Sequence, residues 1–137
     1  MRVLINQAVS TCVSQYENLE HMGYKKKVDK NQSQIVRELN RFGFGVIDFS
    51  RVGAGVPDIC ISHPESDANL LVEIKNLDGK SEETKFNMLT PAQVDFIACW
   101  FGEVYIGTSA ENIMMYFSDY TGIPIEVIAS YEDTENG

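Results

Sequence analysis

The chain has 137 residues, of which 44% are hydrophobic, and this composition excludes collagen, a coiled-coil rod and a disordered chain. Its longest apolar runs are far below the ~20 residues that span a bilayer, no secretory signal is readable, and three widely spaced cysteines suit neither a disulfide framework nor a paired-cysteine zinc site. We therefore expect a soluble cytoplasmic protein with reduced thiols, and its formal net charge of −9 argues against nonspecific affinity for nucleic acid.

The first third of the chain predicts two helices joined by a basic connector. Apolar residues recur every three or four positions between Ile5 and Leu19, which is typical of an amphipathic helix. A second stripe of the same spacing predicts a helix over residues 31–42, which ends at Gly43. The apolar positions of the first stripe are Ile5, Ala8, Val9, Cys12, Val13, Tyr16 and Leu19.

The middle of the chain predicts three strands. Alternating apolar residues over 44–52, a glycine-containing turn and a second strand over 57–62 together indicate a hairpin. Residues 70–75 are rich in apolar side chains, which predicts a third strand at the centre of the sheet. The polar segment 77–89 has little apolar content, and we expect a mobile loop beside the end of that strand.

The last part of the chain has clear helix signals. Thr90 as N-cap and Pro91 at the first helical position predict a helix that runs to Phe101. A short strand over 104–106 follows, and Ser109 begins another helix with an apolar stripe. Residues 123–128 are compatible with an edge strand. The order helix, three strands, helix, strand, helix predicts an α/β fold with a mixed central sheet flanked by helices.

Three charged side chains interrupt segments that otherwise have the composition of buried strands. Glu73 and Lys75 are two residues apart, so the alternation of a strand places both on one face, and Asp58 begins the neighbouring strand. If the two strands pair, the carboxylates of Asp58 and Glu73 approach closely enough to share a hard divalent cation, which relieves their repulsion. The alternative is an exposed Glu73–Lys75 pair on an edge strand with Asp58 ending a turn, and the spacing alone leaves both open.

The pattern Pro57-Asp58 followed by Glu73-Ile74-Lys75 is similar to the signature of the PD-(D/E)XK nucleases. The blocks 52–58, 73–76 and 89–93 resemble the VRR-NUC-type branch of that superfamily, in particular small phage and prophage nucleases, and the resemblance covers about residues 28–111. It implies a restriction-endonuclease-like core with the order α-β-β-β-α-β. Residues 1–27 would then be a helical extension with a basic connector, 28–118 the nuclease core, and 119–137 a C-terminal extension.

The resemblance also implies roles for individual residues. Asp58 and Glu73 would ligate Mg²⁺ or Mn²⁺ together with the carbonyl of Ile74, and Lys75 takes the place of the catalytic lysine. Gln93 would contact the substrate or buttress the site. On sequence alone, the alternative is a solvent-facing helix residue.

The family also carries a polar residue, often glutamate, near the start of the first helix. Here the chain departs from the pattern, because it offers Asp29 and Gln32 and no glutamate at this point. Asp29 also suits an N-cap, and Gln32 an exposed position.

The basic residues are unevenly distributed. Ten of the eleven lie between Lys25 and Lys85, whereas residues 86–137 contain eight acidic residues and no Lys or Arg. Although each basic residue alone reads as solvated surface, together they could form a phosphate-contacting strip on an acidic protein. The DNA-binding candidates are Lys25, Lys26, Lys27, Lys30 and Arg51.

The sequence therefore predicts a metal-dependent DNA endonuclease with water as nucleophile. The acidic C-terminal half favours a restricted substrate, such as branched, flap or junction DNA, and a double-strand cut would need a homodimer or higher oligomer, with the stretch Ile5–Leu19 as an interface element. If the protein is phage-encoded, it would act in the host cytoplasm. The alternatives are a catalytically silent nuclease-fold module that binds a protein partner in phage–host conflict, and a structural protein in which the three charged residues form a salt-bridged cluster.

Overall fold

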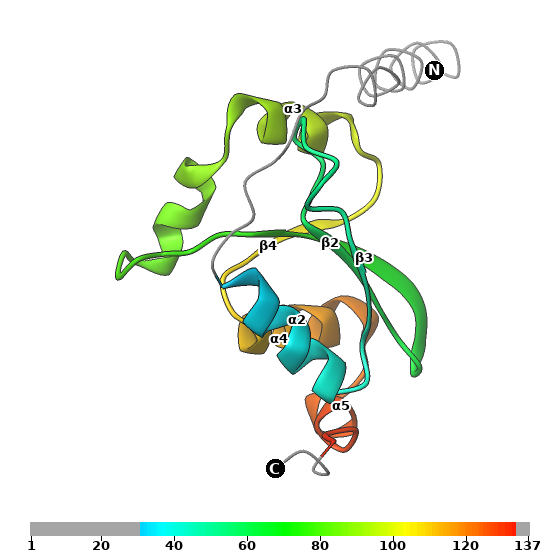
Figure 1. Cartoon of the computed structure of the whole chain (residues 1–137). Helices are drawn as coiled ribbons and strands as arrows, with labels where there is room; N and C mark the ends of the chain where they lie inside the picture. Colours follow the sequence, from blue (N-terminus) through cyan, green and yellow to red (C-terminus); the bar gives the residue numbers. More distant parts are fainter. Residues whose placement is uncertain (1–30, 134–137) are drawn as a thin grey trace, which may run out of the picture.

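A four-stranded mixed sheet organises residues 31–133, the part of the chain that this computed structural model describes (Figure 1). The strands lie in the order β1-β2-β3-β4; the first three are antiparallel, and β4 runs parallel to β3. The predicted hairpin and the central position of the third predicted strand are both confirmed. The strands are β1 (Gly45–Asp48), β2 (Ile59–His63), β3 (Ser66–Ile74) and β4 (Val104–Gly107).

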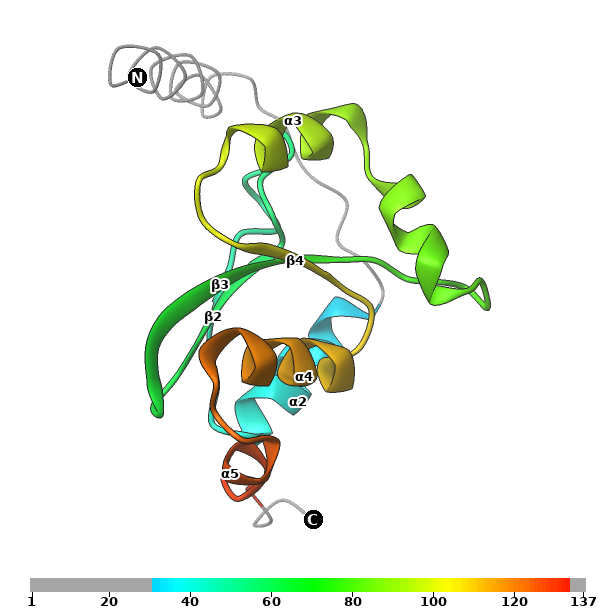
Figure 2. The ribbon, with the colours of Figure 1, turned by 180° about the vertical axis from the view of Figure 1, so that it is seen from behind.

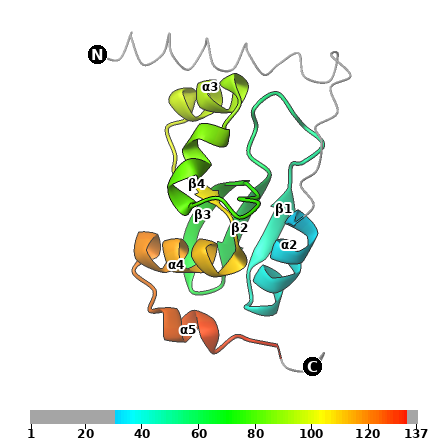
Figure 3. The same ribbon diagram turned by 90° about the vertical axis from the view of Figure 1, so that its left-hand side faces the viewer.

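The helices lie on the two sides of this sheet. Helices α2 (Gln32–Arg41) and α4 (Ala110–Thr121) pack together on one face, whereas α3 (Pro91–Cys99) lies on the opposite side (Figures 1 and 3). Figure 2 shows the same separation from behind, with the short helix α5 (Ile125–Ala129) beyond α4. Within residues 31–133, none of the helices has both the length and the apolar character needed to cross a membrane.

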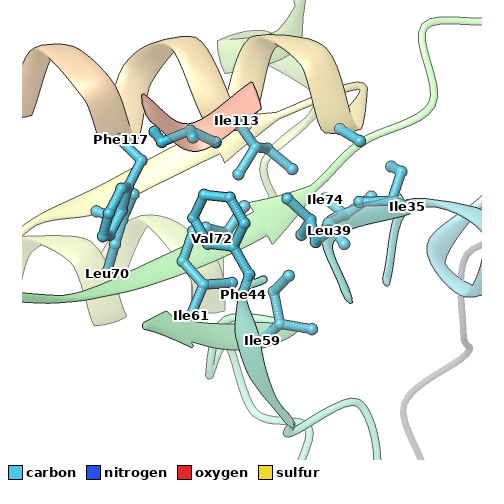
Figure 4. Close-up of a cluster of buried hydrophobic side chains, with 12 residues drawn as sticks. Ile35, Leu39, Phe44, Ile59, Ile61, Leu70, Val72, Ile74, Ile113 and Phe117 are labelled. Carbon is cyan, nitrogen blue, oxygen red and sulfur yellow. The ribbon is translucent and has the colours of Figure 1, made fainter. Parts of the chain in front are cut away.

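The hydrophobic core fills the space between the sheet and the pair α2 and α4 (Figure 4). Alternate residues of β2 and β3 point into it, and Phe117 of α4 packs edge-on against Phe44 with ring centroids 5.2 Å apart. Because Val72 and Ile74 face this core, Glu73 between them points to the other face of the sheet, toward α3. The largest side chains of the core are Ile35, Leu39, Phe44, Ile59, Ile61, Leu70, Val72, Ile74, Ile113, Phe117 and Ile128.

Two predicted helix starts are confirmed by their side chains. Thr90 accepts a hydrogen bond from the backbone N–H of Gln93, and the Gln93 side chain accepts one from the N–H of Thr90. Ser109 and Asn112 form the same reciprocal pair at the start of α4. Each pair satisfies backbone N–H groups that a helix start leaves without partners, which fixes where α3 and α4 begin.

The polar segment after β3 is more ordered than the sequence suggests. It contains a 3-10 helix, η2 (Glu82–Met88), where an irregular loop was predicted. The Lys85 side chain is buried. Its Nζ lies 4.6 Å from the centroid of the Tyr105 ring and 2.8 Å from Glu82 Oε1. This hydrogen bond lowers the pKa of the Glu82 carboxyl from its ordinary value. The segment is thereby attached to β4.

Two further expectations are wrong. Residues 123–128 form no edge strand; α5 lies there instead, and its Ile128 is fully buried in the core. His63 stands in the sequence without a second residue at metal-ligand spacing, which predicts a surface histidine. Its side chain is instead buried between the rings of Phe44 and Tyr131, with centroid distances of 4.7 and 4.8 Å. The predicted helix over Ile5–Leu19 lies outside the described residues.

Candidate active site

The candidate site is built where β2 begins and β3 ends. Ile59 pairs with Val72, so the preceding residue, Asp58, stands beside the following one, Glu73. Asp58 Oδ2 accepts a hydrogen bond of 2.7 Å from the backbone N–H of Ile74, which ties the carboxylate to β3. Both carboxylate residues are only 2% exposed. The antiparallel pairing thus brings together two acidic residues that are fifteen positions apart in the sequence.

Lys75 and Gln93 complete this cluster. Gln93 Nε2 donates to Glu73 Oε1 at 2.7 Å, and Lys75 Nζ donates to Gln93 Oε1 at 2.9 Å. Lys75 Nζ also lies 3.6 Å from Glu73 Oε1. The predicted common face of Glu73 and Lys75 is therefore present, and the solvent-facing alternative for Gln93 is wrong, because its side chain is buried. The exposed edge-strand alternative is also wrong, because β3 lies between β2 and β4.

Helix α3 holds Gln93 in this position through its first turn. The same Oε1 atom that accepts from Lys75 also accepts from the N–H of Thr90 at 2.9 Å, so the helix cap and the site share one side chain. Gly55, in the connection between β1 and β2, has φ +86° and lies directly against this turn. A Cβ on Gly55 would lie 2.1 Å from the carbonyl oxygen of Ala92, so only glycine allows this approach.

The side chains of the site fit a hard divalent cation. Two buried carboxylates with a single lysine carry a formal charge of −1, which such a cation would compensate. Among residues 31–133 no three His, Cys, Asp or Glu side chains gather as a metal-binding group. Mg²⁺ nevertheless commonly takes only one or two carboxylates, with water and substrate phosphate completing its octahedron. Asp58 and Glu73 would supply these ligands, and the carbonyl of Ile74 remains a predicted third.

The predicted site residue of the first helix contacts Asp48, the last residue of β1, which pairs with Ile59 next to Asp58. Gln32 is buried rather than exposed, and its Nε2 donates to Asp48 Oδ1 at 3.3 Å. The same Asp48 oxygen accepts from the N–H of Ser50 at 2.7 Å. Gln32 Oε1 is buried with no hydrogen-bond partner. The sequence did not single out Asp48, although a carboxylate that ends an alternating strand was a readable signal.

The basic candidates are only partly within the described structure. Arg51 is exposed in the connection between β1 and β2, the same connection that carries Gly55 and leads into Asp58. This location leaves it available to a ligand that approaches the end of the sheet. The candidates Lys25, Lys26, Lys27, Lys30 and Asp29 lie outside the described residues.

Neither of the two cysteines within residues 31–133, Cys60 and Cys99, belongs to a disulfide, and both are partly buried. Desolvation raises the pKa of the Cys60 thiol from its ordinary value, so this thiol is less reactive at neutral pH.

Comparison of the chain with protein-family models, with curated proteins and with solved structures gave no match in any of the three.

Proposed function

We propose that this protein is a Mg²⁺- or Mn²⁺-dependent endonuclease that hydrolyses DNA phosphodiester bonds, on a restriction-endonuclease-like core of the PD-(D/E)XK type. The observation that carries the proposal is the buried cluster at the sheet end, in which Asp58 adjoins Glu73 while Lys75 and Gln93 lie within hydrogen-bond distance of each other. The sequence resemblance supports the same assignment, since its signature residues are the ones that meet there.

Each residue of the cluster has a role in this chemistry. Asp58 and Glu73 would hold the cation, which would supply an activated water and polarisation of a phosphoryl oxygen. The Lys75 ammonium stabilises the negative charge that develops on the phosphoryl group during attack by water. Gln93 positions both partners, because its amide donates to Glu73 and accepts from Lys75.

The charge distribution favours a restricted DNA substrate. The acidic residues after position 86 repel a long duplex, whereas the basic residues cluster earlier in the chain. We therefore propose branched, flap or junction DNA as the preferred substrate, contacted by Arg51 and the lysines at 25–27 and 30. Cutting two strands at once would require a homodimer, whose two-fold axis matches that of the DNA. The proposed location is the cytoplasm, or the host cytoplasm for a phage-encoded protein.

Metal binding tests this assignment separately from catalysis. In calorimetric titrations with Mn²⁺, we expect the wild type to release binding heat and Asp58→Asn and Glu73→Gln to lose it. Both substitutions remove a charge and keep the shape and the hydrogen-bond acceptor, so the fold should persist. Asp119→Asn changes an exposed carboxylate of α4 and should titrate like the wild type. Equal Mn²⁺ binding by all four proteins would contradict the proposed ligands.

One observation favours the second candidate, a nuclease-fold module that binds a protein partner. Within the cluster, Glu73 and Lys75 already form an ion pair joined by Gln93, so much of the site is satisfied without metal. If the protein is such a module, Asp58→Asn and Glu73→Gln would keep the affinity for the partner. Neither the wild type nor these two variants would bind Mn²⁺.

A further inference from the structure

The outward side of helix α4 combines exposed carboxylates with exposed apolar side chains. Glu111, Met115 and Asp119 recur every four residues and are all exposed, so they form one continuous stripe along the helix. Tyr116 and Tyr120 form the neighbouring stripe, with stacked rings whose centroids are 6.3 Å apart. Met115 and Tyr120 are 47% and 45% exposed. We call these five residues the α4 face.

The carboxylates of the α4 face have no cation beside them in the described structure. No ion pair within residues 31–133 involves Glu111 or Asp119, and residues 86–137 contain no Lys or Arg. Asp119 lies in the last turn of α4, which has no basic side chain and where a carboxylate adds to the negative end of the helix dipole. A cation supplied by a partner would therefore be stabilised most at this point.

The tyrosine rings beside the acidic stripe already hold one cation. The Tyr105 ring of β4 stacks on Tyr116 with centroids 4.1 Å apart, and Lys85 Nζ lies over the Tyr105 ring. Desolvation and the hydrogen bond that Tyr116 donates to Glu103 raise the pKa of the Tyr116 phenol to about 12, so this phenol stays neutral. At the other end of the stack, Tyr120 has no cation of residues 31–133 over its ring. Its exposed ring is open to a second cation.

We propose that the α4 face binds an arginine-rich segment of another protein. Arginine fits better than lysine, because its planar guanidinium pairs with a carboxylate through two hydrogen bonds and also stacks on an aromatic ring. Glu111 and Asp119 are about 12 Å apart along the helix axis, with Met115 midway. In an extended segment, residues i and i+4 are about 13 Å apart and share one side with residue i+2. The pattern that fits is therefore arginine, any residue, apolar, any residue, arginine.

The same charges disfavour other occupants of the α4 face. DNA phosphates would be repelled by Glu111 and Asp119. A second copy placed face to face would bring these carboxylates against their own counterparts. Helix α4 also lies on the opposite side of the sheet from α3 and the candidate active site (Figure 3). Binding to the α4 face therefore requires neither metal nor DNA, and the proposal is independent of the proposed nuclease function.

Two peptides of equal composition test the spacing. The peptide Gly-Arg-Ser-Leu-Ser-Arg-Gly has the pattern that fits the α4 face, and Gly-Leu-Ser-Arg-Arg-Ser-Gly has the same charge without it. We would titrate each into the full-length ¹⁵N-labelled protein at low ionic strength and follow the amide chemical shifts. The first peptide should bind with a Kd at least about fivefold lower than the second, with the largest shifts at the amides of α4.

Two double variants separate the α4 face from the net charge of the protein. Glu111→Gln/Asp119→Asn removes both carboxylates while keeping the side-chain shapes, and should raise the Kd of the first peptide at least about fivefold. Asp67→Asn/Asp95→Asn removes two exposed carboxylates from β3 and α3, so it has the same net charge and should bind like the wild type.

Equal affinity for the two peptides, or equal weakening by the two double variants, would overturn the proposal, because the attraction would then follow net charge alone. Absence of binding by either peptide would also overturn it. Self-association in light scattering that Glu111→Gln/Asp119→Asn abolishes would assign the α4 face to a second copy of the chain instead. Because these measurements use neither DNA nor metal, their failure is distinguishable from failure of the proposed nuclease function.

Discussion

Lys75→Met should reduce the rate of DNA cleavage by at least about 100-fold while the protein stays folded, since loss of a group that stabilises transition-state charge typically has an effect of this size. Methionine keeps most of the length of the lysine stem and removes only the ammonium that reaches Gln93 Oε1 and Glu73 Oε1. Gln93 Nε2 still donates to Glu73, so the buried carboxylate keeps one partner. Single-turnover cleavage with Mn²⁺ measures the rate, and thermal unfolding checks the fold.

The matched control is Lys80→Met, which removes an exposed ammonium from the segment that follows β3. It should cleave at the wild-type rate. If Lys75→Met lowers the melting temperature and leaves the cleavage rate unchanged, Lys75 is a structural partner of Glu73, and its proposed role in catalysis is wrong.

Gly55→Ala should lower the free energy of unfolding by about 2–5 kcal/mol, the sum of a left-handed backbone penalty and the cost of overpacking. The new Cβ would meet the Ala92 carbonyl oxygen at 2.1 Å and the carbonyl carbon at 2.4 Å, so the first turn of α3 must shift. Gln93 follows Ala92, and the shift would loosen its contacts with Glu73 and Lys75. We therefore expect a loss of cleavage activity together with the loss of stability. Urea denaturation measures the latter.

Gly79→Ala separates the two causes. Gly79 has φ +82°, close to the value at Gly55, but no heavy atom beyond its two chain neighbours lies within 4 Å of the position of its Cβ. This variant carries the backbone penalty alone, about 1–2 kcal/mol, and should leave cleavage unchanged. Equal destabilisation by the two substitutions would show that the contact between Gly55 and α3 contributes nothing.

The sequence predicts much of the candidate site because its residues are fixed by local rules. Alternation along a strand is enough to place Glu73 and Lys75 on one face. Asp58 comes beside Glu73 through the pairing of β2 with β3, which the sequence analysis assumes and does not predict. Gln93 was expected only through the resemblance. The Thr90–Gln93 spacing of a capping box was nevertheless readable, and it explains why this side chain turns back toward the start of its helix.

The remaining features depend on contacts between distant segments, which no local pattern encodes. His63 is buried because Tyr131, sixty-eight residues later, covers it, and its Nε2 lies 3.0 Å from the carbonyl oxygen of Phe42. Lys85 is buried because Tyr105 of β4 lies beneath it. Helix α5 has only five residues, too few for helical periodicity to be recognised, and the β-branched residues in this part of the chain favour a strand.

The most direct test of the proposed function is cleavage of labelled single-stranded, duplex, flap and four-way-junction DNAs by the wild-type protein with Mg²⁺ or Mn²⁺, with EDTA as the control. We expect metal-dependent products, most abundant from a branched substrate, and none with EDTA. Absence of cleavage on every substrate, together with absence of Mn²⁺ binding in calorimetry, would contradict the nuclease function and favour the protein-binding module.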